Sequence, residues 1–337
     1  MSNLNTVSLS DFTDLVSKTF LKGPELVPEV ARQLYIVENM DANTGDTRKY
    51  TEIDTETYAS LKREGQDASI ASVQQGYSVT MSAKRVAKEI TITWEMRRYN
   101  KYPEVTGQLV SLASFVPQRM ELDLTHRLTY AVSTSYTDMD GSTVATVVGD
   151  GLALVSAVHT LRGTATTFSN VITGNPSFSK GGLEVAESQA NTQILSQMGE
   201  RRVMNFNTIV TSDDPNTVNT VKEYLNSTAD VTSNNSGVTN VYKGKYKHVI
   251  LPYLATSASG AYDSTKAKYW FLAATGQGVM GWQAYLGIWE AANLKTPSAG
   301  NNGEDVHNDN WTYGCRGSYG ISTVSPRGLL LSTGLGS

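Results

Sequence analysis

The sequence has little cysteine, little charge and no long apolar run. Cys315 is the single cysteine among 337 residues, which excludes an intrachain disulfide and a zinc site built from cysteines. The first residues lack the charged and then apolar layout of a signal peptide, and no apolar stretch approaches the ~18 residues that cross a bilayer. We therefore expect no membrane association and a chain kept in a reducing cytosol, or in an assembly formed there.

Charged residues make up only 18% of the chain, and 28 Lys and Arg face 32 Asp and Glu, for a net charge of −4. This balance is unlike that of a dedicated nucleic-acid-binding domain, which is strongly basic. A surface poor in charge is typical of a protein that is covered by other subunits, because interface centres are depleted in charged residues. The alternative is a β-rich binding or adhesion module without such partners, which would contain no long helix.

The sequence contains one partial match to a cofactor-binding motif. Residues Gly276–Gly281 read G-Q-G-V-M-G and match the dinucleotide-binding pattern G-x-G-x-x-G after a possible strand. An acidic residue should follow ~20 residues later at the end of a second strand, whereas Glu290 comes too early and lies in a helix-like run. We predict no cofactor site, no enzyme and no catalytic residue. A nucleotide-dependent enzyme that uses Gly276–Gly281 is the alternative from a different class.

Metal sites are not predicted either. The four histidines share no paired spacing: His126, His159, His248 and His307. The segment 138–142 resembles the start of a calcium loop but lacks the glutamate required at the twelfth position. A hairpin turn at Asp140-Gly141 is the better interpretation, because Asp-Gly is a strong turn signal.

The strongest pattern in the chain is a long amphipathic helix over residues 102–134. Its apolar residues recur in steps of three and four: Val105, Leu109, Leu112, Val116, Met120, Leu124, Leu128, Ala131 and Val132. Pro103 suits the first helical position, whereas Pro117 predicts a kink or a short break. At ~1.5 Å per residue the helix would be on the order of 45 Å long.

Strand patterns precede this helix. Residues 77–82 and 90–96 alternate strictly between polar and apolar, and we interpret roughly 45–92 as a long excursion built on a two-stranded ribbon. An isolated ribbon is only marginally stable in water, so this one needs a surface on which to lie. We predict a short amphipathic helix over residues 10–20 and expect Phe12 and Phe20 to dock on another part of the fold or on another subunit.

The chain after the long helix alternates between helices and strands. A second helix is predicted over 182–199, capped by Ser179 and closed by Gly199. From residue 203 the pattern indicates a smaller α/β domain that extends to about 310. The final strands are expected to return to the first domain.

This order of elements resembles the major capsid protein of tailed bacteriophages, whose fold is shared with encapsulins. Two local segments are also similar to those of one branch of phage coat proteins. The segment VHTLRGTATTFSN ends in the pair Ser169-Asn170 before the second helix, and the chain ending through 313–320 and 326–328 is rich in strands. The resemblance covers nearly the whole chain. It implies an α+β fold with an N-terminal arm, an extended β-ribbon loop, a peripheral domain with a spine helix, and an axial α/β domain.

The resemblance also implies a division of the chain. The expected parts are the arm 1–40, the extended loop 41–95, the peripheral domain 96–202 with spine helix 102–134, the axial domain 203–310, and closing strands of the peripheral domain 311–337. The extended loop would lie over a neighbouring subunit, and the axial domain would meet its copies at the centre of each hexamer or pentamer.

The implied function is that of a major capsid (head) protein of an icosahedral shell that encloses double-stranded DNA, bound without sequence specificity. The implied location is the virion, with assembly in the bacterial host cytoplasm. Implied partners are a portal, a decoration protein and a separate scaffolding protein or a trimmed chain, since 1–32 is too short for a scaffolding segment. An encapsulin-like nanocompartment is the alternative within the fold. Some members cross-link a loop lysine, but nothing marks a partner for Lys49 or Lys62, and we predict no cross-link.

Overall fold

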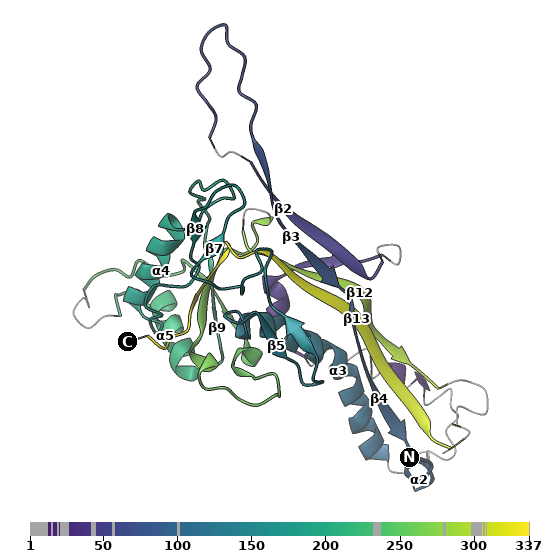
Figure 1. The fold of residues 1–337 in the computed structure, drawn as a ribbon. Helices are drawn as coiled ribbons and strands as arrows, with labels where there is room; N and C mark the ends of the chain where they lie inside the picture. The colour runs from purple at the N-terminus through teal and green to yellow at the C-terminus, as the bar shows by residue number, and fades with distance from the viewer. Residues whose placement is uncertain are drawn as a thin grey trace.

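The computed structural model describes the following residues: 13, 14, 16–18, 20, 27–41, 45–55, 58–99, 102–231, 237–278, 281–297, 305, 307 and 309–336. Figure 1 shows a rounded part that contains α4 and α5, a long part formed by α3 and the strands beside it, and a hairpin that projects away from both. The part formed by α3 and its strands is called the arm below and is distinct from the N-terminal segment 1–40. Within the described part of the chain, no helix is long and apolar enough to span a membrane.

The arm is built on a four-stranded sheet with the order β1-β12-β13-β4. Its strands are β1 (Ile36–Asn39), β12 (Gln283–Lys295), β13 (Trp311–Ser325) and β4 (Lys84–Ile92). The pairs β12–β13 and β13–β4 are antiparallel, and β1 lies parallel to β12. The β13–β4 pairing runs from Trp311 opposite Ile92 to Tyr319 opposite Lys84, so the last residues of β13 extend beyond β4.

Helix α3 (Tyr102–Thr129) lies along this sheet (Figure 1). Its predicted apolar face is confirmed, because these members are buried: Val105, Leu109, Leu112, Val116, Leu124 and Leu128. A kink or a short break was predicted at Pro117, and the break is wrong, since the helix is continuous through this residue. A proline inside a helix removes only one backbone hydrogen bond. The helix ends five residues early because turn-type bonds, such as Ala131 N to Leu128 O, replace its ladder.

The rounded part contains a second sheet with the order β10-β9-β11-β14. Its strands are β10 (Lys247–Ile250), β9 (Thr208–Thr211), β11 (Trp270–Ala273) and β14 (Leu329–Ser332). Every residue of β9, β11 and β14 is buried, which indicates that both faces of the sheet are covered.

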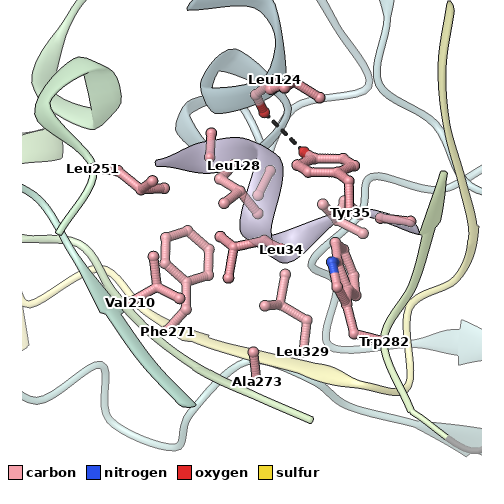
Figure 2. Packing of buried hydrophobic residues seen from close by; sticks show 14 of the residues in the cluster. Leu34, Tyr35, Leu124, Leu128, Val210, Leu251, Phe271, Ala273, Trp282 and Leu329 are labelled. Carbon is pink, nitrogen blue, oxygen red and sulfur yellow. Dashed lines mark hydrogen bonds between the residues drawn. The ribbon is translucent and has the colours of Figure 1, made fainter. Parts of the chain in front are cut away.

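Alternate residues of this sheet enter two different cores. Val210 and Phe271 pack with Leu124 and Leu128 of α3, as Figure 2 shows. Their neighbours, such as Ile209, belong to a cluster with α4 (Lys180–Thr192) and α5 (Pro215–Asn226). The sheet therefore lies between the end of α3 and the α4–α5 pair.

Shorter elements complete the chain. They are η2 (Ala31–Leu34), α2 (Trp94–Arg98), η5 (Pro252–Ala255), η6 (Lys266–Lys268) and the hairpins β5 (Ser135–Thr137) with β6 (Thr143–Ala145) and β7 (His159–Thr160) with β8 (Thr167–Phe168). The predicted turn at Asp140-Gly141 is confirmed, and Gly141 has the positive φ of +81° that favours glycine.

Three sequence predictions are corrected. Ser179 does cap α4 through Gly182 N, but the helix ends at Thr192, and Gly199 (φ +85°) instead closes a tight turn. The alternation over 90–96 does not continue as a strand, because α2 begins after Ile92. The helix-like run around Glu290 is strand β12, since pairing on both sides overrides its local preference.

Strand pairing also cuts across the expected boundaries. β12 falls in 203–310 yet pairs with β1 and β13, whereas β14 falls in 311–337 yet pairs with β11. Both segments therefore contribute to both sheets. Within 41–95, only β2 (Thr47–Thr55) and β3 (Val73–Ser82) form the two-stranded ribbon, because β4 joins the sheet of the arm.

The N-terminal residues that are described lie against α3. Val16 and Phe20 are buried in a cluster with Ile92, Val105 and other residues of the arm. The expected docking of Phe20 on another part of the fold is therefore confirmed. Ser10 and Phe12 lie outside the described residues.

Leu124 should be the most sensitive position where α3 meets the second sheet, because its side chain is fully buried in the core of Figure 2. We expect Leu124→Ala to lower the free energy of unfolding by about 2–5 kcal/mol through loss of apolar burial and the cavity left behind. Val132→Ala is the matched control, since Val132 is 44% exposed, and should cost less than about 0.5 kcal/mol. Urea unfolding measures both; equal costs would contradict this packing.

Candidate functional site at the base of the hairpin

The β2–β3 ribbon carries a tip, residues 58–72, that projects from the molecule (Figure 1). Its large apolar side chains point into solvent: Leu61 is 89% exposed and Ile70 is 96% exposed. Ile53, Tyr58 and Val73 are each more than 60% exposed as well. Large apolar side chains this exposed are candidates for a contact surface.

The base of the ribbon, in contrast, is held by buried charges. Glu52 of β2 forms an ion pair with Arg327, and the two residues are only 4% and 2% exposed. Gln197 Nε2 donates to the second carboxylate oxygen of Glu52 at 2.7 Å. Arg327 Nε donates to Leu195 O, and the guanidinium lies 5.2 Å from the ring centroid of Phe168. The buried charges are thus paired and hydrogen-bonded, which offsets their loss of hydration.

Further polar contacts attach the ribbon to residues of the segments 160–162 and 197–202. Asp54 Oδ2 accepts from Gln197 N at 2.8 Å, and its other oxygen pairs with Arg202 at 3.3 Å. On β3, Gly76 O accepts from Arg162 at 3.1 Å, and Tyr77 shares a hydrogen bond of 2.9 Å with Thr160. Both strands are therefore fixed, and the direction in which the tip projects is fixed with them.

Close backbone approach requires glycine at two of these contacts. A Cβ at Gly149 would lie 2.4 Å from Tyr77 Cβ, and a Cβ at Gly320 would lie 2.6 Å from Ser82 O. Both distances are shorter than real Cβ contacts, so any side chain would push β3 away from the body. These two glycines carry no recognisable motif, and sequence reasoning missed them.

A buried hydrogen-bond network links two residues of the segment 158–170, His159 and Asn170. Asn170 Nδ2 donates to Leu154 O and Pro326 O, so Asn170 Oδ1 is the acceptor that faces His159 Nε2 at 3.1 Å. His159 Nδ1 lies 2.7 Å from Asp150 Oδ2. The buried ring of His159 therefore links Asp150, one residue after Gly149, to Asn170.

Burial by itself raises the pKa of Asp150. The hydrogen bond and the positive charge of His159 outweigh that effect, and the pKa of Asp150 lies below its ordinary value. The network is structural, because both carboxylate and imidazole are buried and bonded within the chain. The sequence indicated His159 and Asn170 as parts of one pattern but not that they touch.

The alternative cofactor loop does not have the required geometry. Residues 276–281 connect β11 to β12, so a strand follows the glycines where a dinucleotide site needs a helix N-terminus. Val279 and Met280 lie outside the described residues. Gly276 and Gly278 have positive φ values of +74° and +55°, which explains glycine there as a turn requirement. Among the described residues, no group of three or more His, Cys, Asp or Glu is placed to hold a metal ion.

Comparison with known proteins decides the fold. No protein-family model and no curated protein matches the sequence. In contrast, the solved structure of the bacteriophage PhiM1 mature capsid is similar to this chain, with a TM-score of 0.52 and 9% sequence identity. The superposition covers 89% of this chain and 85% of the PhiM1 chain. The chain has the tailed-phage capsid fold. The expected fold class is therefore confirmed, and at this identity the match concerns the fold alone.

Two other solved structures are similar at lower scores. A virus-like particle from Pyrococcus furiosus covers 95% of this chain and 99% of its own, with 8% identity and a TM-score of 0.47. The capsid of cyanophage P-SCSP1u covers 89% and 86%, with 13% identity and a TM-score of 0.48. The assignment of the capsid fold rests on the first match.

Removing one partner of the buried pair should be much more costly than removing both. We expect Arg327→Leu to lower the free energy of unfolding by about 3–5 kcal/mol, because Glu52 stays buried without its counter-charge. The double variant Glu52→Leu/Arg327→Leu should recover most of that loss. The control is Lys245→Leu, which removes a partly exposed partner of Glu187 and should cost about 0–1 kcal/mol. Denaturant unfolding that gave Arg327→Leu the cost of the control would contradict an electrostatic anchor.

The lowered pKa of Asp150 predicts a pH dependence. The unfolded chain binds a proton at this group near pH 3.9 and the folded chain only at lower pH, so its stabilisation is present above that range and is lost as pH falls. We expect Asp150→Asn to be less stable than the parent by about 1–3 kcal/mol at pH 7, with a smaller difference at pH 3. Unfolding in urea at pH 7, 5 and 3 measures this, with the exposed Asp67→Asn as control. A difference that stays constant with pH would contradict the ion pair.

Proposed function

We propose that this chain is a major capsid protein that self-assembles, without catalysis, into hexamers and pentamers of an icosahedral shell enclosing double-stranded DNA. The capsid fold supports a shell-forming role. The observation that carries the proposal is the hairpin: its tip exposes large apolar side chains, while its base is held by the buried ion pair of Glu52 and Arg327.

The physical argument concerns where that apolar surface can be covered. Among the described residues, none covers the large apolar side chains of the tip 58–72, and the base of the ribbon is held against the rest of the molecule. A copy related by rotation offers the same body surface to each tip, so head-to-tail contacts repeat until a ring closes. A low proportion of charged residues agrees with a surface that is largely covered in such an assembly.

The finer organisation is part of the same proposal. The extended loop within 41–95 lies over a neighbouring copy, α3 is the spine helix, and the α/β unit around β9 and β11 meets its copies at the ring centre. The partners are a separate scaffolding protein, a portal and a decoration protein. Packaged DNA is held without sequence specificity, in agreement with the net charge of −4. The shell is that of a virion assembled in the bacterial host cytoplasm.

A pair of substitutions at the tip tests the proposal. Leu61→Asp with Ile70→Asp places carboxylates where the apolar contact is proposed, and both side chains are almost fully exposed in the single chain. We expect the variant to keep the unfolding midpoint of the parent and to form no shells or rings in negative-stain images. The matched control is Ser60→Asp with Ser69→Asp, which adds the same charges at neighbouring exposed positions and removes no apolar side chain.

Two outcomes would contradict the proposal. One is normal shell formation by the Leu61 and Ile70 variant. The other is a parent protein that remains monomeric by light scattering under all assembly conditions. Nuclease-resistant DNA inside particles from infected cells is expected for a phage head, whereas particles that enclose a cargo enzyme and no DNA would point to a nanocompartment.

A further inference from the structure

Three hydrogen bonds tie the C-terminal end of helix α3 to the segment 252–258, which follows β10 of the second sheet. They are Thr129 Oγ1 to Leu254 O at 3.1 Å, Ala258 N to Tyr130 Oη at 2.8 Å, and His126 Nε2 to Thr256 O at 3.2 Å. Since α3 belongs to the arm and β10 to the rounded part, these bonds hold the two parts together. This contact is called the joint below.

His126 is fully buried in the joint, with an exposed fraction of 0%. A carbonyl oxygen only accepts hydrogen bonds, so Nε2 carries the ring proton that faces Thr256 O, and Nδ1 is an acceptor in the neutral ring. Nδ1 is buried and has no hydrogen-bond partner among the described residues. A second proton on this ring would therefore be a buried donor without an acceptor, which is costly.

Aromatic rings exclude water from this imidazole. Tyr130 and Tyr136 stack with their ring centroids 4.5 Å apart, and each is nearly perpendicular to the ring of His126, at 5.6 and 5.5 Å. On Tyr130, Lys266 Nζ lies 3.6 Å from the ring centroid and also pairs with Asp263 at 3.5 Å. A charged imidazolium would have little hydration in these surroundings.

The charged groups around the ring already pair with one another. Those that act on it are Asp123 and Arg119 of α3 and Asp138, which follows β5. Lys84 of β4 pairs with the two aspartates at 3.2 and 2.8 Å, and Arg119 pairs with the same two. Asp140, on the same hairpin, is exposed to water. Burial outweighs the attraction of the two aspartates, so the pKa of the imidazole lies below its ordinary value.

We propose that His126 makes the joint acid-sensitive, because a proton taken up by Nδ1 favours the open joint, in which the ring reaches water, over the closed one. The exposed ring binds this proton near pH 6.5 and the buried ring only at lower pH. The stabilisation of the closed joint is therefore complete at neutral pH and is lost as pH falls. The contact lies within one chain, so the proposal does not rest on shell assembly.

Urea unfolding of the full-length chain at pH 7 and pH 5 tests the proposal. In His126→Gln the amide offers a donor to Thr256 O and takes up no proton in this range. A histidine that is protonated only after opening lowers the folding equilibrium constant by about 25-fold between these pH values. We therefore expect the parent to lose about tenfold or more beyond the loss of His126→Gln.

The matched control is His307→Gln, which removes an exposed histidine. This control should keep the pH dependence of the parent. Equal losses in the parent and in His126→Gln between pH 7 and pH 5 would overturn the proposal.

Two measurements on the parent keep the test independent of how any variant folds. Hydrogen exchange of the Ala258 amide, corrected for the intrinsic rate at each pH, should show about tenfold less protection at pH 5 than at pH 7, because this amide donates to Tyr130 across the joint. NMR of the histidine-labelled chain, with His126 assigned by its contacts to Tyr130 and Tyr136, should show a neutral ring with the proton on Nε2 in the folded chain at pH 5. A ring that is protonated at pH 5 while Ala258 keeps its protection would overturn the proposal.

Discussion

The buried pair of Glu52 and Arg327 is the constraint on which the geometry of the molecule depends. It joins the second strand of the chain to a residue near its end, across 275 positions of sequence. Both charges are out of water, so they are stable only while they face each other. A two-stranded ribbon is only marginally stable by itself. This contact holds the β2–β3 hairpin in one direction.

A fixed direction matters because no described part of the chain covers Leu61 and Ile70 of the tip. Leu61 and Ile70 would be a liability on a mobile loop, where they could associate with any apolar surface. On an anchored hairpin they face one region of space, and a copy placed there by symmetry meets them in the same way each time. The sheet β10-β9-β11-β14 supports this arrangement, since one of its faces packs against the end of α3 and the other against α4 and α5.

The sequence predicted the elements whose signal is local. The long helix followed from its apolar spacing, the Asp140-Gly141 hairpin from its turn residues, and the Ser179 cap from its position before an apolar run. Local preference failed where pairing decided the outcome: the segment around Glu290 became a strand between two others, and Trp94 entered a short helix. The anchor was not predictable either, because Glu52 and Arg327 are ordinary charged residues until the fold brings them together.

The most direct test of this account is a cryo-electron microscopy map of the particle formed by the unmodified chain. The account predicts a closed shell in which residues 58–72 are buried, with Leu61 and Ile70 in contact with a neighbouring copy. A map in which these side chains remain in solvent, or a preparation that contains only monomers, would contradict it.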